Sequence, residues 1–387
     1  MKAGFKKSIL LLGLWAGFTQ VAQAIVPTPP EIFAKAYLVM DANTGVVLSE
    51  RGADDRLDPA SLTKMLTSYV ADYELAKGRI HLSDMTTVSE RAWAKNFPGS
   101  SLMFLQVGTQ VSVEDLLKGV VISSGNDATI ALAEHIAGSA DAFADLMNQH
   151  AQKIGMKHSH FMNPHGLSDP NHYTTARDMA ILAQAIIRDF PDRYKVYAQK
   201  SYVYNNITQQ NRNTLLWTDP SVDGLKTGHT DIAGYCLVAS AKRGDMRLIT
   251  VVLGTDSTKA RAVETQKILA YGFRNFKTLK LYSKNQVVTK AHLWGGETAD
   301  VSLVAKADVY ATLPAAQASA VSTKMKVNQY IQAPLKAGTQ LGTIEVTLPD
   351  GKVLSSALVV KDDVVKGGFF VRIWDAIHLF FFKMMQG

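Results

Sequence analysis

The sequence is poor in cysteine and has little imbalance of charge. Cys236 is the single cysteine among 387 residues, so an intramolecular disulfide cannot form and folding cannot depend on one. Lysine and arginine total 41 against 34 acidic residues, and no basic cluster is interleaved with aromatic residues, which argues against nucleic-acid binding. Hydrophobic residues make up 47% and charged residues 19%, which is typical of a globular protein.

The first 24 residues have the pattern of a secretory signal peptide. Three lysines precede an apolar run from Ile9 to Phe18, and Ala22-Gln23-Ala24 matches an A-x-A cleavage signal. The run is too short for a stable membrane span. Removal of this segment on export would lower the formal net charge from +7 to about +4.

Hydrophobic periodicity predicts a mixed α and β domain in the first part of the chain. Strand-like alternation occurs mainly near both ends of that part, at residues 36–41, 46–49, 202–204, 234–241 and 248–253. Helical patterns occur at residues 62–77, 113–122, 127–136, 140–154, 175–187 and 259–273. Strands at both ends with helices between them favour an antiparallel sheet with helical layers, which is the α+β class.

The helical period ends near Asn275. Alternating segments follow, such as Thr343 to Leu348 and Lys352 to Val360, on either side of a Pro-Asp-Gly turn. These segments predict a small all-β second domain. The predicted divisions are a signal peptide at 1–24, an α+β domain at 25–275, the β-rich domain at 276–367 and a terminal helix at 368–387.

The C-terminal segment is amphipathic. Between Phe369 and Met385, Arg372, Asp375 and His378 form one stripe of a helix whose other positions are mostly large and apolar. The segment is too short and too charged to span a bilayer, so we expect it to lie in the membrane interface as an anchor. The alternative is a helix that docks on the β-rich domain.

Ser61-Leu62-Thr63-Lys64 is the first candidate for chemistry. Pro59 precedes a predicted helix start, and Lys64 returns to the same helix face as Ser61 one turn later. A lysine amine held there can act as a base towards the serine hydroxyl if its pKa is depressed. An S-x-x-K pattern alone is weak evidence, because it arises by chance.

Ser124-Gly125-Asn126 lies between two helical patterns. Ser124 could relay a proton between Lys64 and a leaving amine, and Asn126 could hold a substrate amide. An ordinary interhelical turn with Asn126 as a helix cap is the structural alternative.

Lys226-Thr227-Gly228 precedes the strand predicted from Gly234. Lys226 and Thr227 offer a cation and a hydroxyl for a substrate carboxylate, and glycine permits close approach of a ligand. The backbone N–H of His229 could pair with that of Ser61 as an oxyanion hole. Lys226 would also lower the pKa of Lys64. A plain hairpin turn would explain the tripeptide equally well.

The three patterns together, in this order, resemble the signature set of penicillin-binding proteins and serine β-lactamases. More specifically, the chain is similar to the D-alanyl-D-alanine carboxypeptidases among the low-molecular-weight penicillin-binding proteins, from residue 25 to the end. The segments that carry this similarity are LDPASLTKMLTSYV (57–70), SSGNDA (123–128), FMNPHGL (161–167), TTARDMA (174–180) and VDGLKTGHT (222–230).

The resemblance implies a two-step acyl transfer that needs no cofactor. Ser61 would attack the penultimate D-alanine of a peptidoglycan pentapeptide and expel the terminal one, and β-lactam antibiotics would acylate the same serine. Lys226 and Thr227 would hold the terminal carboxylate, assisted by Arg212 and Arg261 unless these are ordinary exposed arginines. The two chain ends imply a periplasmic location, at the outer face of the inner membrane.

Other activities compete with this interpretation. A class A β-lactamase would use a glutamate to activate the deacylating water, but Glu134 is the single glutamate between Ser124 and Lys226 and lies on a predicted helix. D,D-endopeptidase action and a non-catalytic cell-wall-binding role stay open. A metal site is disfavoured, because the nearby histidines lack an H-E-x-x-H pattern and are better explained as solvated loop residues; these are His158, His160, His165 and His172.

Overall fold

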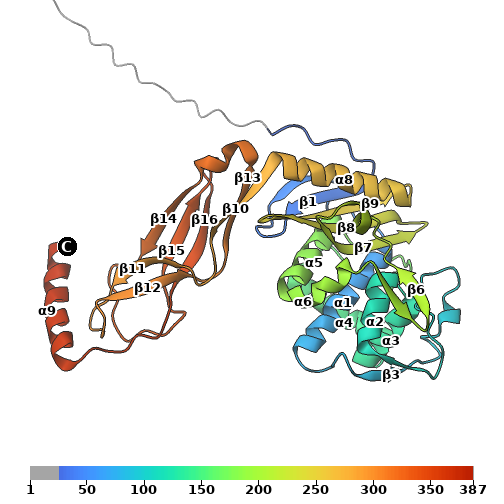
Figure 1. Cartoon of the computed structure of the whole chain (residues 1–387), viewed down its shortest axis with the longest axis horizontal. Helices are drawn as coiled ribbons and strands as arrows, with labels where there is room; N and C mark the ends of the chain where they lie inside the picture. The colour runs from blue at the N-terminus through green and yellow to red at the C-terminus, as the bar shows by residue number, and fades with distance from the viewer. Residues whose placement is uncertain (1–25, 387) are drawn as a thin grey trace, which may run out of the picture.

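The computed structural model describes residues 26–386, so the predicted signal peptide lies outside the described residues. A domain of mixed helices and strands is followed by an elongated domain of strands and then by one terminal helix (Figure 1). The predicted α+β class and the all-β second domain are both confirmed.

A five-stranded antiparallel sheet forms the centre of the first domain. Its spatial order is β2-β1-β9-β8-β7, so the first strands of the chain lie beside strands that come some 200 residues later. The sequence pattern predicts four of these strands and misses β7. The strands span Ala36–Asp41 (β1), Val47–Arg51 (β2), Val222–Thr230 (β7), Gly234–Arg243 (β8) and Met246–Thr255 (β9).

The sheet separates two apolar cores, because successive side chains of a strand point to opposite faces. Leu38 and Met40 of β1 join the core on the side of the helical layer. Tyr37 and Val39 join the core beneath α8 (Thr258–Asn275), which covers the other face (Figure 1). The sheet is therefore buried on both faces, and β7 forms one of its two edges.

The helical layer holds most of the remaining elements of the first domain. Ser112, Ser139 and Thr175 cap three of its helices, each accepting a hydrogen bond from a backbone N–H three residues later. The predicted helix at 113–122 is split into an α-helix and a π turn. The helices are η1 (Ala60–Leu62), α1 (Thr63–Ala76), η2 (Ala94–Asn96), α2 (Val113–Lys118), the π turn η3 (Gly119–Ser123), α3 (Asn126–Ala137), α4 (Ala140–Ile154), α5 (Ala176–Asp189), α6 (Pro191–Tyr194) and η4 (Lys195–Ala198). The short helix α7 (Leu215–Thr218) packs instead in the core beneath α8. Two further antiparallel pairs are formed by β3 (Met85–Thr87) with β4 (Gln110–Ser112), which are distant in sequence, and by the hairpin of β5 (Ser201–Tyr204) and β6 (Ile207–Gln210).

The second domain is built from antiparallel strands around its own apolar core. Its main sheet has the order β11-β12-β16-β15-β14, and β10 pairs with β13. The predicted hairpin around the Pro-Asp-Gly turn is present as β15 and β16. The elements are β10 (Phe276–Tyr282), β11 (Val287–His292), β12 (Asp300–Ala305), β13 (Val309–Pro314), η5 (Ala315–Ala320), β14 (Ser322–Val327), β15 (Gln340–Thr347) and β16 (Val353–Val360).

Asp41 links the two domains. Its buried carboxylate accepts a hydrogen bond from the Thr278 hydroxyl of β10 at 2.6 Å, and also bonds the backbone N–H groups of Asn43 and Thr44. The Thr44 hydroxyl in turn lies 2.8 Å from that of Thr312 on β13. One carboxylate at the end of β1 therefore satisfies donors from both domains.

Asp41→Ala is expected to lower the free energy of unfolding by about 3 kcal/mol, because several buried donors lose a charged acceptor. Denaturant unfolding followed by tryptophan fluorescence measures this loss. Asp245→Ala is the matched control, since its side chain is exposed on the adjacent β8–β9 turn. Equal unfolding midpoints for the two variants would contradict the predicted role of Asp41.

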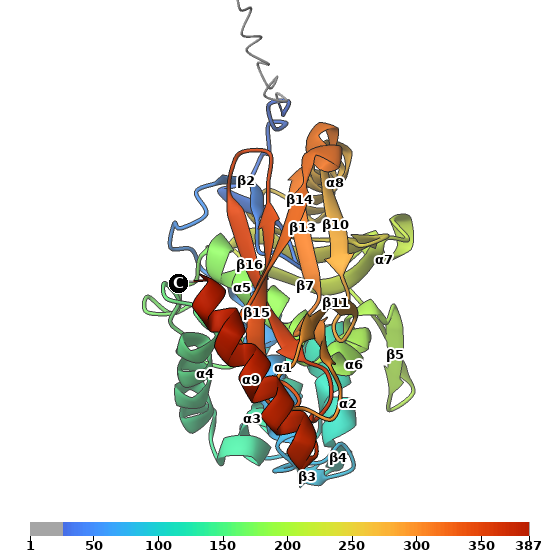
Figure 2. The same ribbon diagram turned by 90° about the vertical axis from the view of Figure 1, so that its left-hand side faces the viewer.

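The terminal helix α9 (Phe369–Gln386) lies against the second domain along a narrow strip (Figure 2). Asp375 accepts a hydrogen bond from the Gly295 N–H at 2.7 Å, Leu379 is buried, and the Phe382 ring lies 6.0 Å from that of Trp294. Asp375, a member of the predicted polar stripe, therefore faces the second domain. The alternative prediction, a helix that docks on the β-rich domain, is therefore correct for the side of α9 that carries Asp375, Leu379 and Phe382.

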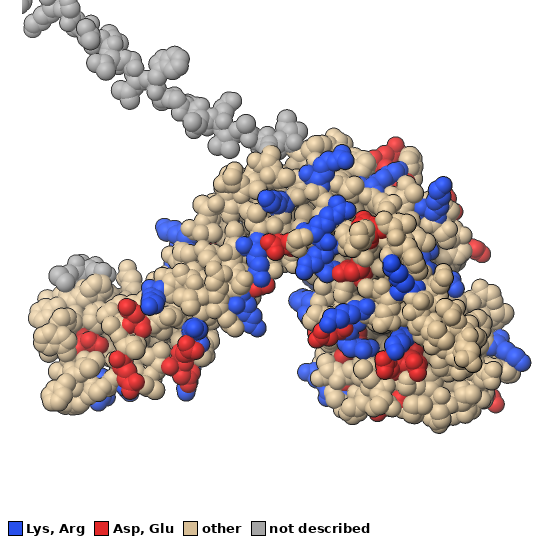
Figure 3. Space-filling model, viewed as in Figure 1, with Lys and Arg blue, Asp and Glu red and all other residues tan. Residues whose placement is uncertain are grey.

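The rest of α9 exposes large apolar side chains. Phe370 is 85% exposed, Trp374 65% and Phe381 58%. In Figure 3 the end of the molecule formed by α9 is mostly tan, whereas charges of both signs are mixed over the first domain. Across residues 26–386, no helix is both long enough and apolar enough to cross a membrane.

Candidate active site

Ser61 lies in the 3₁₀ turn η1, directly before α1 and not inside the first turn of the α-helix. The preceding Ala60 has φ = +47°, in a region that non-glycine residues rarely adopt. The Asp58 carboxylate supports this turn by accepting a hydrogen bond from the Ala60 N–H at 2.7 Å. Lys64 follows on α1, and its Nζ donates to Ser61 Oγ at 3.1 Å. The S-x-x-K spacing therefore brings the amine to the hydroxyl.

The Lys64 amine is buried among oxygen atoms. Besides Ser61 Oγ, its Nζ donates to Asn126 Oδ1 at 2.7 Å and to the backbone carbonyl of His165 at 2.6 Å. Burial, assisted by the positive charge of Arg212, lowers the pKa of Lys64 to about 7. A large fraction of the amine is therefore neutral near pH 7, as a general base requires.

Ser124 follows the π turn η3 and has φ = +63°. Gly125 after it has ordinary extended angles, so this position does not depend on the conformational freedom of glycine. A Cβ on Gly125 would lie 2.9 Å from the backbone nitrogen of Met103, so glycine allows close packing here. The sequence predicts that Ser124 relays a proton from Lys64. In the structure, Ser124 Oγ instead accepts a hydrogen bond from Lys226 Nζ at 2.9 Å.

Lys226, Thr227 and Gly228 lie inside strand β7 and do not form a turn, so the hairpin alternative is wrong. β7 is the edge strand of the sheet and packs against the Ser61 turn. A Cβ on Gly228 would lie 3.1 Å from the carbonyl oxygen of Pro59, which explains the glycine. Burial, followed by the charges of Lys64 and two arginines, lowers the pKa of Lys226 well below its usual value.

A cleft of about 780 Å³ opens between β7, the Ser61 turn and the segment that follows η3. Two of the predicted site residues, Lys64 and Lys226, lie behind its wall with exposures of 1% and 3%. The other predicted residues line it directly: Ser61, Ser124, Asn126, Arg212, Thr227, His229 and Arg261. The structure thus brings all nine residues to one place, although they come from four separate parts of the chain, at 61–64, 124–126, 212–229 and 261.

The two arginines differ in their surroundings. Arg261 of α8 is 7% exposed, and its guanidinium donates to the carbonyl of Gly228 at 3.3 Å, so the exposed-arginine alternative is wrong for it. Arg212 is exposed at the rim of the cleft. His229 is also exposed, and its ring stacks on that of Tyr235 with centroids 4.0 Å apart. Two cationic groups therefore flank β7 on the cleft side, where an anionic ligand would be favoured.

The chain and its parts are similar to known proteins over nearly their whole length. A profile of D-alanyl-D-alanine carboxypeptidases matches residues 23–257, and one of the penicillin-binding protein 5 C-terminal domain matches residues 276–366. The D-alanyl-D-alanine carboxypeptidase DacA of Haemophilus influenzae is 46% identical over 98% of this chain and 97% of its own. The chain belongs to the D-alanyl-D-alanine carboxypeptidase family.

Solved structures agree with this assignment and confirm the resemblance found in the sequence. Penicillin-binding protein 5 from Haemophilus influenzae is 47% identical, with a TM-score of 0.78 over 88% of this chain and all of that one. Penicillin-binding protein D2 from Listeria monocytogenes, in its ampicillin-bound form, is 27% identical with a TM-score of 0.58, and it matches 64% of this chain and all of that one. The protein is a serine-type D-alanyl-D-alanine carboxypeptidase with a penicillin-binding-protein fold and a C-terminal all-β domain.

The carboxypeptidase site contains a loop that sequence reasoning missed as a functional element. The carbonyl of His165 bonds the Lys64 amine, and that of Pro164 accepts from the Thr67 hydroxyl at 2.6 Å. Gly166 has φ = +86°, and a Cβ there would lie 1.9 Å from the carbonyl oxygen of Ala60. The sequence FMNPHGL predicts only the family resemblance, because the groups that bond Lys64 and Thr67 are backbone carbonyls, which residue patterns do not report.

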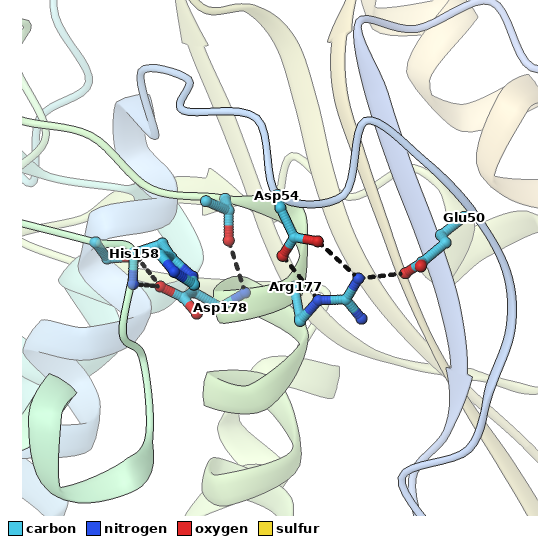
Figure 4. A network of polar contacts seen from close by, with 7 residues as sticks. Glu50, Asp54, His158, Arg177 and Asp178 are labelled. Carbon is cyan, nitrogen blue, oxygen red and sulfur yellow. Dashed lines mark hydrogen bonds and ion pairs between the residues drawn. The ribbon is translucent and has the colours of Figure 1, made fainter.

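A network of polar contacts in the carboxypeptidase holds the segment that leads into this loop (Figure 4). The Asp178 carboxylate accepts from the His158 N–H at 2.8 Å and from the Ser159 hydroxyl at 2.7 Å. Arg177 beside it pairs with Asp54 and with Glu50, each at 2.8 Å. The start of α5 therefore fastens both the loop and the segment that leads to Ser61.

The four histidines considered as a metal site make separate contacts. His160 and His165 bond backbone atoms of their own loop, whereas His172 is 2% exposed and lies 2.8 Å from Thr63 Oγ1. Their interpretation as solvated residues is therefore wrong for His172. Over the described part of the chain, no group of three or more His, Cys, Asp or Glu residues could hold a metal ion.

Glu134, the glutamate weighed for the β-lactamase alternative, does not line the cleft. It lies on α3, where its carboxylate accepts from the Ser89 hydroxyl at 2.6 Å. Asp231, just beyond β7, is the acidic residue among those that line the cleft.

Proposed function

We propose that the protein removes the terminal D-alanine from peptidoglycan stem pentapeptides through an acyl-enzyme on Ser61. The contact between Lys64 Nζ and Ser61 Oγ, in a buried site that depresses the pKa of the amine, is the observation that supports this proposal most directly. A neutral Lys64 takes the serine proton while Ser61 attacks the penultimate carbonyl. The proton then reaches the leaving amine of D-alanine, and water releases the shortened peptide.

The remaining residues bind the substrate and carry charge. Lys226 and Thr227 hold the terminal carboxylate, with Arg261 beside β7 and Arg212 at the rim of the cleft adding positive charge. Ser124 lies 2.9 Å from the Lys226 amine and so can pass a proton towards the leaving group.

Two further groups complete the proposed site. Asn126, which already accepts from Lys64, presents its amide to the peptide. The N–H groups of Ser61 and His229 form the oxyanion hole.

β-Lactams are proposed to acylate the same serine. A related penicillin-binding protein is known in an ampicillin-bound form. Glu134 of α3 bonds Ser89, and none of the described residues that line the cleft is a glutamate that could activate water against the ester. We therefore propose that the penicilloyl enzyme is long-lived and that penicillin hydrolysis is slow.

Benzylpenicillin labelling tests the central proposal. Intact mass of the treated protein should increase by one benzylpenicillin, and peptide mapping should place the adduct on Ser61. The same preparation should release D-alanine from a diacyl-lysyl-D-Ala-D-Ala peptide. A folded protein without a stable adduct would refute the acyl-enzyme. An adduct without D-alanine release would instead favour the endopeptidase or binding roles.

We also propose that the enzyme acts in the periplasm, attached by α9 to the outer face of the inner membrane. The signal-peptide pattern supports export. The broad exposed face of α9, with Phe370, Trp374 and Phe381, supports burial among lipid headgroups and acyl chains.

Vesicle sedimentation tests the attachment. The chain from residue 25 should bind anionic phospholipid vesicles, and the triple variant F370S/W374S/F381S should bind at least tenfold more weakly, because three large apolar groups no longer enter the interface. Val203→Ser is the matched control, since Val203 is 62% exposed on the β5–β6 hairpin of the other domain. Equal sedimentation of the triple variant and the control would refute the anchor.

A further inference from the structure

His172 connects the loop of residues 161–167 to the first turn of α1. Its ring is 2% exposed and packs edge-on against Phe161 with centroids 5.5 Å apart. The backbone N–H of Met162 donates to His172 Nδ1 at 3.1 Å, and Nε2 lies 2.8 Å from the hydroxyl of Thr63. Thr63 is the first residue of α1 and the neighbour of Lys64.

These contacts define the protonation of the ring. Because Nδ1 accepts a hydrogen bond, the proton of the neutral ring lies on Nε2 and is donated to Thr63. Burial lowers the pKa of His172 to about 4, although the charges of Asp58 and Asp169 oppose the shift; those of His160 and Lys64 add to it. The ring therefore stays neutral at physiological pH, and both of its hydrogen bonds persist.

The loop held in this way provides the polar contacts of the lysine. Only two residues separate Met162 from His165, whose carbonyl bonds Lys64 Nζ. Gly166 lies against Ala60, and a Cβ there would also lie 2.8 Å from Thr63 Oγ1. Any outward movement of the loop would remove the carbonyl from Lys64 and admit water to the amine.

Other contacts also fix the loop, and one of them joins it to α1, from the Thr67 hydroxyl to the Pro164 carbonyl. Asn148 of α4 bonds both the N–H and the carbonyl of Phe161, at 2.9 and 2.8 Å. Asp178 holds the start of the loop at His158 and Ser159 (Figure 4). These contacts preserve the loop as a structure, and the His172 ring adds a link to Thr63, the residue of α1 next to Lys64.

We propose that His172 is a positioning residue for acyl transfer, which holds the His165 carbonyl against Lys64 and keeps that amine dry and within reach of Ser61. This inference rests on the proposed role of Lys64 as the base. It assigns to His172 no contact with the substrate, so its loss should slow acylation and leave substrate affinity nearly unchanged.

Three substitutions of His172 separate its two hydrogen bonds. His172→Phe removes both, His172→Asn keeps an acceptor near the Nδ1 position for Met162, and His172→Gln keeps a donor near the Nε2 position for Thr63. We expect His172→Phe to slow benzylpenicillin acylation on the order of 100-fold, the scale on which small displacements of catalytic groups act. The Asn and Gln variants should lie between it and the wild type.

The pH dependence of acylation distinguishes positioning from a general loss of structure. Water admitted to Lys64 would raise its pKa towards the usual value, so the rise of the rate with pH should move to higher pH in His172→Phe. Partial unfolding would lower the amount of active enzyme and leave the position of that rise unchanged. His160→Gln is the matched control just before the same loop, because the His160 ring is bonded to the backbone carbonyl of Asn171.

Thr63 gives a second route if His172→Phe does not fold. Thr63→Val removes the partner of Nε2 at constant shape and should slow acylation and shift the pH dependence, whereas Thr63→Ser should restore both. A folded His172→Phe or Thr63→Val enzyme with wild-type rate and pH dependence would overturn the inference. A wild-type enzyme that forms no adduct on Ser61, or whose rate does not rise near pH 7, would instead refute the proposed function itself.

Discussion

Ser61→Ala should lower kcat/KM for D-alanine release by on the order of 10⁴- to 10⁶-fold, the scale seen when a serine nucleophile is removed from a comparable catalytic group. The hydroxyl is the atom that Lys64 contacts at 3.1 Å, so its loss leaves the base without a proton to accept. Benzylpenicillin should then produce no mass adduct. Lys226 and Thr227 remain in place, so the variant should still bind the peptide without cleaving it.

Ser100→Ala is the matched control for this prediction. Ser100 lines the same cleft but makes no contact with Lys64. Its variant should acylate with unchanged stoichiometry on Ser61. An adduct that persists in Ser61→Ala would identify a different nucleophile, for which Ser124 beside Lys226 would be the first candidate.

Periodicity predicted the parts of the fold that local physics decides. Alternation in β1 places Leu38 and Val39 in opposite cores, and a serine or threonine cap marks the start of α4 and α5. β7 escaped prediction because Lys226, Thr227 and two glycines give it no apolar alternation. Its place is set by pairing with β8 and by packing against the Ser61 turn, and both of these are tertiary effects.

The side-chain motifs located the candidate site, but they did not predict which of its groups form hydrogen bonds with one another. The left-handed conformations of Ala60 and Ser124 follow from the turns that surround them, since neither residue type favours φ > 0. Ser124 pairs with Lys226, although the motif order suggested Lys64. The contribution of His165 is a backbone carbonyl, which any residue could supply, so no residue pattern reports it.

Lys64→Met should reduce the rate of acylation by benzylpenicillin by about 10²- to 10⁴-fold, the contribution usual for a positioned general base. Methionine fills the buried site with a side chain of similar length but cannot accept the Ser61 proton. In the wild type, the base is the neutral amine, and its pKa is about 7. The neutral fraction falls about tenfold for each pH unit below that value and becomes nearly constant above it. The wild-type rate should therefore rise with pH through about 7 and then level off.

The shape of the pH profile is the decisive measurement, because a folding defect changes only its height. Lys64→Met should lose the rise near pH 7 altogether, and Lys64→Arg should be no better, since its guanidinium stays protonated. Lys77→Met, at the exposed end of the same helix, should retain the wild-type rate and profile. A wild-type rise near pH 10 would mean that Lys64 titrates as a solvated lysine. A rise near pH 7 that survived in Lys64→Met would assign the base to another residue.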